Sequence, residues 1–323
     1  MGLRDLATGS EYVRQTLANY LQNLVDMGVA GFRLDASKHM PSGDIANILG
    51  RISGDFFVFQ EVIDQGGEVI SSNEYLGNGS VTEFKYSLEL SRVFKGGDLR
   101  WLGNFGEGWG FIPSTRSVVF VDNHDNQRGH GGAGDIVTHK DAGFYDLING
   151  FMLAWPYGYP KVMSSYAFTD TEAGPPVTAS GRSAPVHAED GLRCFDPNGW
   201  QCEHRWTPIA NMVEFKNVTQ AAFQTNDFVT DGPDRIAFAR GDRGFFAMQR
   251  GGGGNWGTWF TTALPAGRYC NVYNSYPSAD GQRCELTNGE EAPSVQVFGD
   301  TRAFVSVPPG QFVALHRNSR LLN

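Results

Sequence analysis

The chain has 323 residues, of which 41% are hydrophobic and 13% aromatic, and its formal net charge is −9. This length can bury a large core and supports a main domain with a second one attached. The acidic charge, without a cluster of Lys and Arg, argues against nucleic acid and anionic membranes as partners. No apolar run approaches the roughly 18 residues of a membrane span, so we expect a soluble protein with a neutral substrate.

The first two thirds of the chain alternates between helical and strand patterns. Apolar residues recur at helical spacing from Glu11 to Met27, with Ser10 as N-cap and Gly28 as the stop. We then expect, in chain order, a strand in "VAGFRLDASKH", a helix over 45–52, a strand in "DFFVFQEV", a weaker strand in "VTEFKYS", a helix over 88–94, a strand in "SVVFVDNHD", a helix over 142–155 and a strand in "YPKVMSSYAF".

This alternation predicts parallel strands with helices packed outside them, either as a doubly wound sheet or as a barrel. No GxGxxG motif follows a strand, which disfavours the dinucleotide-binding form. From about Arg235 the pattern changes to short strand-like runs between Gly, Pro, Asn and Asp turns, typical of an antiparallel sandwich of roughly 90 residues. We therefore expect an α/β region over 1–233 and an all-β domain over 234–323.

The four cysteines fall into two local pairs, Cys194 with Cys202 and Cys270 with Cys284, in loop-rich segments. Their even number and short separation predict two disulfides and therefore an oxidising, extracellular location; free buried thiols are the alternative. No cysteine or histidine spacing indicates zinc. The first ten residues, "MGLRDLATGS", contain no apolar signal-peptide core, so we expect Met1 not to be the natural start of a secreted chain.

Three of the predicted strands end in an acid. Arg33 and Asp35 share a face at the end of the first, Glu61 follows the second, and Asp125 follows the strand in "SVVFVDNHD". In a parallel barrel the carboxyl ends of all strands open onto one rim, where catalytic groups are placed. A single acid at such a position is more often a helix N-cap or a surface group. Three at corresponding positions indicate a site.

Three converging carboxylates suit glycoside hydrolysis, in which one attacks the sugar carbon, one protonates the leaving oxygen and a third holds the substrate. His39 and His124 lie near these acids, although either could be an ordinary hydrogen-bonded histidine. Trp101 and Trp109 fit core packing better than sugar stacking.

Several motifs resemble those of alpha-amylases of glycoside hydrolase family 13, of the animal and actinobacterial type. The signature-like segments are "GFRLDASKH", "QEVID" and "FVDNHD", and the similarity continues through "DNQRGHG", "VTEFKY", "GEGWGF", "MLAWPYGYPKVMSSY" and "CEHRW". It covers nearly the whole chain. It implies the C-terminal part of a TIM (β/α)8 barrel, followed by an antiparallel β-sandwich domain.

The resemblance also implies roles for individual residues. Asp35 would be the nucleophile, Glu61 the general acid/base and Asp125 the group that stabilises the transition state. Arg33 would orient Asp35, and an adjacent guanidinium would lower the pKa of that carboxyl. The reaction would retain configuration, with the Asp35 and Glu61 carboxyls about 5–5.5 Å apart. Substrate contacts would come from Lys38, His39, Ile63, Glu68, His124 and His130.

The sequence departs from the family at an anion pocket. In animal-type amylases a chloride ion is held by residues that correspond to Arg33 and Asn123 and by a second basic residue after "SSY". This chain has Ala167 there. Because one compensating cation is missing, we expect no chloride requirement.

A second departure concerns the start of the chain, since the family carries roughly half a barrel more before the segment where this chain begins. Asp5 and the His39 backbone match two calcium positions, and the remaining ligands would come from the absent part. A half barrel exposes sheet edges, which favours pairing with a second copy as a homodimer.

These departures leave three functions open. The first is endo-hydrolysis of alpha-1,4-glucans such as starch. The second is a catalytically impaired glucan-binding or interaction module. The third is another reaction of the same family, such as transglycosylation.

Overall fold

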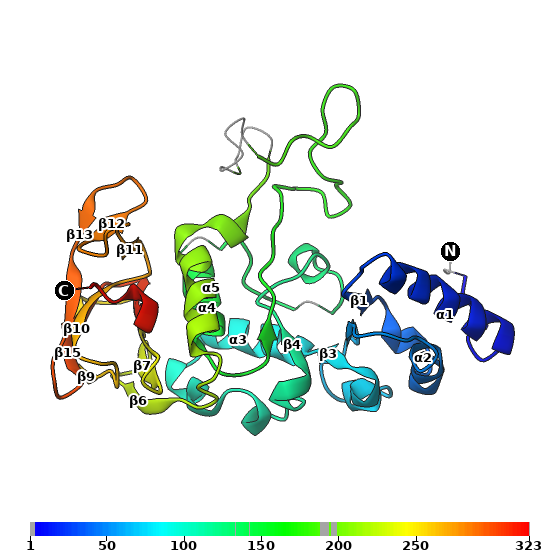
Figure 1. Cartoon of the computed structure of the whole chain (residues 1–323), viewed down its shortest axis with the longest axis horizontal. Helices are drawn as coiled ribbons and strands as arrows, with labels where there is room; N and C mark the ends of the chain where they lie inside the picture. Colours follow the sequence, from blue (N-terminus) through cyan, green and yellow to red (C-terminus); the bar gives the residue numbers. More distant parts are fainter. Residues whose placement is uncertain (1–3, 133, 142, 188–193, 195–198, 323) are drawn as a thin grey trace.

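The computed structural model describes residues 4–132, 134–141, 143–187, 194 and 199–322. Figure 1 shows a parallel sheet with its helices in the centre and right of the view and an antiparallel β region at the left. This confirms the predicted fold class, a partial (β/α) barrel followed by an all-β domain. No helix among the described residues is long and apolar enough to cross a membrane.

The parallel sheet contains five strands in sequence order. Gly31 pairs with Phe57, Phe59 with Ser80, and each later strand pairs with the one before it. All five carboxyl ends therefore lie at one edge, as the sequence predicts for the acids that follow them. The strands are β1 (Gly31–Leu34), β2 (Phe57–Gln60), β3 (Ser80–Thr82), β4 (Ser117–Val119) and β5 (Tyr159–Pro160).

Helices connect and cover these strands. The first begins where the sequence predicts, because the Ser10 hydroxyl accepts a hydrogen bond from the Val13 N–H as an N-cap. The α-helices are α1 (Glu11–Asp26), α2 (Ser42–Leu49), α3 (Phe84–Gly96), α4 (Tyr145–Ala154) and α5 (Thr207–Thr219). Short 3-10 helices are η1 (Ser37–His39), η2 (Ser72–Asn78), η3 (Leu99–Asn104), η4 (Glu107–Trp109), η5 (Ser114–Arg116), η6 (Asn126–Arg128), η8 (Glu203–Arg205) and η9 (Arg317–Ser319).

Two details of the predicted α/β pattern are wrong. The segment "VTEFKYS" is only briefly a strand, since β3 ends at Thr82 and α3 begins at Phe84. Glu83 makes this change abrupt, because its carboxylate accepts the Lys85 N–H as a helix N-cap and the Ile112 N–H at 2.8 Å. Helix α5 was not anticipated, because its apolar residues are spread around the helix instead of forming one stripe.

The C-terminal region contains eleven antiparallel strands in four small sheets. The larger sheet has the order β16-β8-β7-β6, and three smaller ones pair β9 with β15, β10 with β14, and β12 with both β11 and β13. The strands are β6 (Asn226–Thr230), β7 (Arg235–Arg240), β8 (Gly244–Gln249), β9 (Trp256–Thr261), β10 (Gly267–Cys270), β11 (Ser275–Pro277), β12 (Cys284–Leu286), β13 (Glu291–Ala292), β14 (Ser294–Val297), β15 (Arg302–Val307) and β16 (Gln311–His316).

The four-stranded sheet joins the two regions, because both of its faces are buried. One face packs in the same core as α4 and α5, through Ile236, Phe238, Phe246, Met248, Phe312 and Ala314. The opposite face forms the sandwich core, through Ala237, Phe245, Ala247, Val313 and Leu315. Strands buried on both faces read as continuous apolar runs, which explains "RIAFARG" and "GFFAMQR".

Arg240 ties this sheet to the ends of two helices. Its side chain is fully buried and donates hydrogen bonds to the carbonyls of Ala154, Thr219 and Ala222. Ala154 ends α4 and Thr219 ends α5, so one guanidinium satisfies carbonyls that have no partner within a helix. Burial lowers the pKa of Arg240 to about 10, so it keeps its charge at neutral pH.

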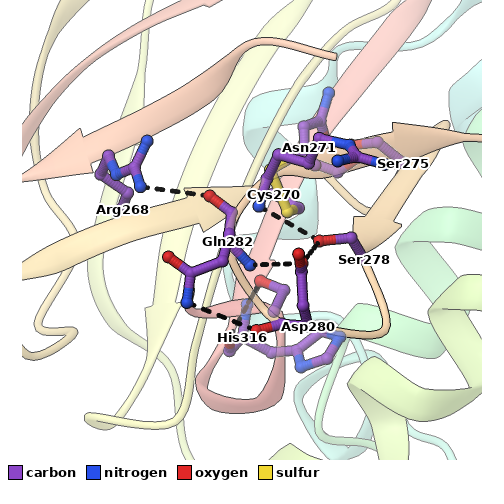
Figure 2. The surroundings of a disulfide bond; sticks show 11 residues. Arg268, Cys270, Asn271, Ser275, Ser278, Asp280, Gln282 and His316 are labelled. Carbon is purple, nitrogen blue, oxygen red and sulfur yellow. Dashed lines mark hydrogen bonds between the residues drawn. A yellow bond between two sulfur atoms is a disulfide. The ribbon is translucent and has the colours of Figure 1, made fainter. Parts of the chain in front are cut away.

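Both predicted disulfides are formed, Cys194–Cys202 and Cys270–Cys284, with Cα–Cα separations of 5.8 and 5.4 Å. Figure 2 shows the surroundings of the second. There Asp280 accepts hydrogen bonds from the Ser278 hydroxyl at 2.6 Å and the Gln282 N–H at 3.1 Å. The bond therefore closes a turn that is also held by side chains.

Gly150 of α4 lies against a buried aromatic ring of the β region. A Cβ at this position would lie 2.5 Å from the Phe312 ring, which is fully buried. We predict that Gly150→Ala lowers the free energy of unfolding by about 1–2 kcal/mol, because the steric cost exceeds the gain in helix propensity. Urea denaturation measures this change.

Gly43→Ala in α2 is the matched control, since a Cβ there meets no atom within 4 Å. This substitution should raise the free energy of unfolding by about 0.5–1 kcal/mol. Equal effects of the two substitutions would contradict the packing explanation.

Candidate active site

The Arg33 guanidinium connects two of the predicted acids. Arg33 lies on β1, its Nη1 is paired with Asp35 Oδ1, and its Nη2 lies 2.9 Å from Glu61 Oε1. Leu34 pairs with Gln60 in the parallel register, so Asp35 and Glu61 occupy equivalent positions one residue beyond β1 and β2. The sheet therefore brings these two acids together, as the strand pattern predicts.

Glu61 is held in a fixed position. Its side chain is 6% exposed, and Oε2 accepts a hydrogen bond from the Ala36 N–H at 2.9 Å. Oε1 forms an ion pair with Arg33, but no donor among the described residues has the geometry of a hydrogen bond to it. Ala36 has a left-handed backbone with φ of +46°, a costly conformation for a residue with a Cβ, and this conformation accompanies its N–H bond to Glu61.

Asp35 is the exposed member of the pair, with 72% of its side chain accessible. The hydrogen bond from Arg33 lowers the pKa of Asp35 below its ordinary value, against a smaller opposing effect of burial. The Arg33 charge, a hydrogen bond with Glu61 and the nearby His124 imidazole lower it further. Asp35 is therefore an ionised carboxylate at neutral pH, which suits attack on an electrophilic carbon.

Asp125 lies in a tight turn beyond β4. The Asn123 side-chain oxygen accepts the N–H groups of Asp125 and Asn126 at 3.0 and 2.7 Å, which fixes the start of this turn. His124 Nε2 lies 3.6 Å from Asp125 Oδ2. Because His124 also acts on the pKa of Asp35, the residues after β4 face the same site as those after β1 and β2.

A pocket of about 260 Å³ lies at these strand ends; Glu61 lines it, whereas Asp35 and Asp125 are not among its lining residues. It is lined by side chains from β1, β2, β3, β4 and the segments that follow β4 and β5: Arg33, Phe59, Glu61, Thr82, Val118, Phe120, Asp122, Asn123, His124, Lys161, Val162 and Met163. Cationic, anionic and apolar groups all contribute to its wall. The two residues of the predicted anion pocket, Arg33 and Asn123, share this cavity.

Sequence reasoning missed Asp122 and Lys161. Asp122 is buried, accepts a hydrogen bond from the Tyr145 hydroxyl at 2.8 Å, and has a pKa raised to about 8 by burial. Lys161 Nζ lies 4.9 Å from the centre of the Phe59 ring. Asp122 stands in the same motif as Asp125, but strand alternation alone does not reveal that it turns into the wall.

The other predicted substrate residues fall into two groups. Lys38 Nζ donates to the Ile63 carbonyl at 2.7 Å and pairs with Glu68, so these three lie together beyond β1 and β2. His39 is exposed beside them. His130 stands on the glycine-containing loop, with Nε2 3.3 Å from Glu172 Oε1.

The loop over 129–131, which carries His130 between two glycines, lies against the site. Gly131 has φ of +62°, and a Cβ there would lie 3.5 Å from side-chain carbons of both Asp125 and Ile63. The Asp125 carbonyl also accepts the N–H groups of Arg128 and His130 at 2.9 and 3.1 Å. The loop that carries His130 is thus anchored on Asp125 itself.

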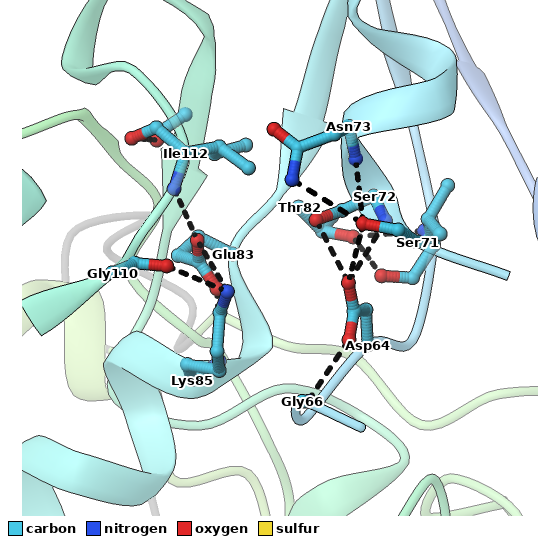
Figure 3. Close-up of polar contacts among 12 residues, drawn as sticks. Asp64, Gly66, Ser71, Ser72, Asn73, Thr82, Glu83, Lys85, Gly110 and Ile112 are labelled. Atoms are coloured by element: carbon cyan, nitrogen blue, oxygen red, sulfur yellow. Dashed lines mark hydrogen bonds and ion pairs between the residues drawn. The ribbon is translucent and has the colours of Figure 1, made fainter. Parts of the chain in front are cut away.

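Two buried acids that the sequence did not single out hold the loops beneath the site. As Figure 3 shows, Asp64 accepts hydrogen bonds from the N–H groups of Gly66 and Ser72, each at 2.9 Å, and from the hydroxyls of Ser71 and Ser72. Glu83 accepts from the segment before β4 through Ile112. These contacts are structural. Of the two acids in "QEVID", only Glu61 directly follows the strand, so the strand-end pattern identified Glu61 and not Asp64.

The predicted calcium residues do not form a complete site. Asp5 and His39 are both exposed, and within the described part of the chain no three His, Cys, Asp or Glu side chains are grouped to hold a metal. Calcium takes six to eight oxygen ligands, so these two positions alone do not fit the ion. At the anion pocket Ala167 contributes no cation, but Lys161 lines the same cavity as Arg33 and Asn123 and supplies one.

A parallel sheet with paired acids at its carboxyl edge, followed by an antiparallel domain, defines the class of (β/α)-barrel proteins whose sites lie at the strand ends. Comparisons with known proteins narrow this class. Residues 226–318 match the family model described as the alpha amylase C-terminal all-beta domain.

Two curated relatives match most of the chain. Human alpha-amylase 1B is 43% identical over 339 aligned residues, covering 93% of this chain, and rat pancreatic alpha-amylase is 42% identical, covering 99%. A mutant of alpha-amylase I from Eisenia fetida, solved in complex with maltohexaose, superposes with a TM-score of 0.89 at 38% identity over 98% of this chain.

The chain is a homologue of these alpha-amylases over 93–99% of its own length. It spans 65% of the human protein's length, 66% of the rat protein's and 66% of the Eisenia fetida chain, just under two thirds in each case.

The environment of Asp35 leads to a prediction about its ionisation. Arg33→Gln removes the hydrogen bond and charge that favour the carboxylate, so we expect the pKa of Asp35 to rise. Carbon-13 NMR titration of aspartate carboxyl groups measures this without requiring activity. Lys38→Gln is the control, because Lys38 pairs with Glu68 and should leave the Asp35 titration unchanged. An unchanged titration in Arg33→Gln would contradict the assignment.

Proposed function

We propose that this chain carries the catalytic acids of an endo-acting hydrolase for alpha-1,4-glucosidic bonds in starch- or glycogen-type polysaccharides. The observation that carries the proposal is the Arg33 guanidinium between an exposed, ionised Asp35 and a buried Glu61. Such a pair divides the work of a retaining glycosidase between a nucleophile and an acid. The names of the relatives supply the substrate class.

In the first step, an Asp35 carboxylate oxygen attacks the anomeric carbon while Glu61 donates its proton to the glycosidic oxygen. The bond between carbon and leaving oxygen breaks, and a covalent glycosyl–Asp35 ester forms. In the second step, Glu61 removes a proton from water, whose oxygen displaces Asp35. Two inversions at the same carbon give net retention, and both carboxyl groups return to their starting protonation.

Neighbouring groups have supporting roles in this proposal. Asp125, in its fixed turn, stabilises positive charge on the sugar and binds its hydroxyls, assisted by His124 at 3.6 Å. Lys38, His39, Ile63 and Glu68 contact the leaving side of the glucan. His130, on the loop anchored to Asp125, reaches the bound chain from the other side.

A glucan-binding or interaction module is the second candidate. It is favoured by the open sheet, in which β1 and β5 each have one paired neighbour. Phe57 is 50% and Tyr159 62% exposed, with ring centres 6.2 Å apart, so apolar surface is accessible beside the strands.

We propose that a second copy of the chain covers this surface as a homodimer. A monomeric mass in sedimentation velocity would refute that proposal.

The disulfides support the proposal that the protein acts outside the cell, because such bonds persist in oxidising compartments. Protease-mapped disulfides in protein recovered from the native source's culture fluid would support it. Recovery only from the cell interior would not.

The catalytic assignment predicts the effect of two isosteric substitutions. Asp35→Asn removes the nucleophile and Glu61→Gln removes the proton donor, so each should lower the rate by at least about a thousandfold. Release of reducing sugar from soluble starch measures this. Asp55→Asn, an exposed acid outside the site, is the control and should match the parent. Activity that survives both substitutions would refute the assignment, and an inactive parent would favour the binding module.

The expectation that chloride is not required depended on the lack of a second cation, and the pocket contradicts that reason. Lys161 lines the same cavity as Arg33 and Asn123, so a second cation is present although Ala167 supplies none. We therefore propose that an anion such as chloride can bind there and that it raises activity. The initial rate should increase when sodium chloride replaces sodium acetate at the same ionic strength, and equal rates would contradict the proposal.

A further inference from the structure

The outer face of the β9–β15 ribbon carries aromatic side chains where a strand pattern normally places polar ones. In β15, Arg302, Phe304 and Ser306 are exposed and alternate with buried Ala303, Val305 and Val307. Trp259 of β9 lies directly opposite Phe304 in the antiparallel register. Trp259 is 49% and Phe304 52% exposed, so the two largest residues of this ribbon's outer face are open to solvent.

Trp259 forms a ridge between two hollows. The larger, about 690 Å³, lies between β6 and β9 and contains Asp231, Arg235, Asn255, Thr258 and Thr261 among its lining residues. The smaller, about 310 Å³, is lined by Trp259, Phe298, Gly299, Asp300 and Arg302. Phe298 and Phe304 place their ring centres 5.7 and 5.9 Å from that of Trp259, which makes the ridge a continuous aromatic surface.

One pair of charges beside this ridge is neutralised within the chain. Arg235 Nη1 lies 2.6 Å from Asp231 Oδ2, and Arg235 Nε donates to Gln249 at 3.2 Å. The Arg302 guanidinium lies 5.4 Å from the centre of the Trp259 ring. Asp227, Asp300 and Arg302 also line the hollows, so the surface carries charges of both signs. Carboxylate, guanidinium, hydroxyl and amide groups beside an open aromatic face suit a ligand rich in hydroxyls, which can donate and accept hydrogen bonds.

We infer that the β9–β15 face is a second binding site for alpha-glucan, with one glucose unit stacked on Trp259. The C–H groups of a pyranose ring match the negative face of an indole, and its hydroxyls point toward polar groups in the two hollows. Exposed apolar patches rimmed by polar groups commonly mark binding sites. The ligand class rests on the proposed function, whereas the site itself does not use the catalytic acids.

The position of this face separates it from the strand ends. In Figure 1, β9 and β15 lie at the left end of the molecule and β1 lies toward the right, with α4 and α5 between them. A glucan on Trp259 therefore does not occupy the pocket that contains Glu61. Binding there would hold a polymer on the protein without changing the cleavage of a short oligosaccharide.

The test uses sedimentation of the Asp35→Asn protein with granular starch, so that the granules are not digested. Trp259→Ala in this background should lower the affinity for granules by about tenfold, as expected for the loss of one stacking contact. Phe223→Ser is the matched control, because Phe223 is 82% exposed and lies outside both hollows, and it should bind like the Asp35→Asn parent. Melting temperatures verify that both variants fold.

The outcomes separate this inference from the proposed catalysis. Granule binding that depends on Trp259 supports the inference even if the chain with intact Asp35 hydrolyses nothing. Equal binding by the Trp259→Ala and parent proteins, no binding by the parent, or equal binding to cellulose would overturn it. If Trp259→Ala changes the mass measured by sedimentation but leaves starch binding unchanged, the inference is also overturned. That result would identify the face as a contact between copies of the chain.

Discussion

The candidate site depends on one guanidinium held between two acids. Arg33 can contact both Asp35 and Glu61 only because β1 and β2 are parallel and in register, so that equivalent positions beyond each strand lie side by side. The two carboxylates that contact the Arg33 guanidinium differ in their exposure to solvent. Exposed Asp35 is favoured as a carboxylate, while Glu61 is fixed by Ala36 in a nearly dry position. Two chemically similar side chains thus have unequal surroundings, one open to solvent and one buried.

The rigidity of this arrangement comes from packing far from the acids. The four-stranded sheet of the C-terminal region shares one core with α4 and α5 and another with the sandwich. Arg240 binds carbonyls at the ends of both helices, and Gly150 allows the Phe312 ring to lie against α4. Because β5 follows α4 directly, the C-terminal region supports one side of the parallel sheet. The β domain is therefore part of the framework that positions the strand ends.

The alternation of strands and helices was sufficient to predict the parallel sheet, and the acid after each strand was sufficient to place Asp35 and Glu61 together. What strand periodicity does not contain is a partner distant in the sequence. In the sequence, Asp64 and Glu83 resemble surface acids. In the structure their carboxylates accept hydrogen bonds from the N–H groups of Ser72 and Ile112. Likewise, β6 pairs through an irregular register with β7 and has few buried residues, so its sequence lacks clear alternation. Trp259 lies in one of the short strand-like runs after Arg235, and nothing in the local sequence shows which face of that strand remains uncovered.

The separation of Trp259 from the strand ends gives the proposed glucan site a physical role. The two hollows beside Trp259 share no lining residue with the pocket that contains Glu61, so a glucan bound on Trp259 leaves that pocket free. A polymer held on Trp259 remains near the same molecule after each dissociation from the strand ends, which raises its effective concentration there. The proposed glucan site would thus favour long glucans and offer no such advantage on short ones.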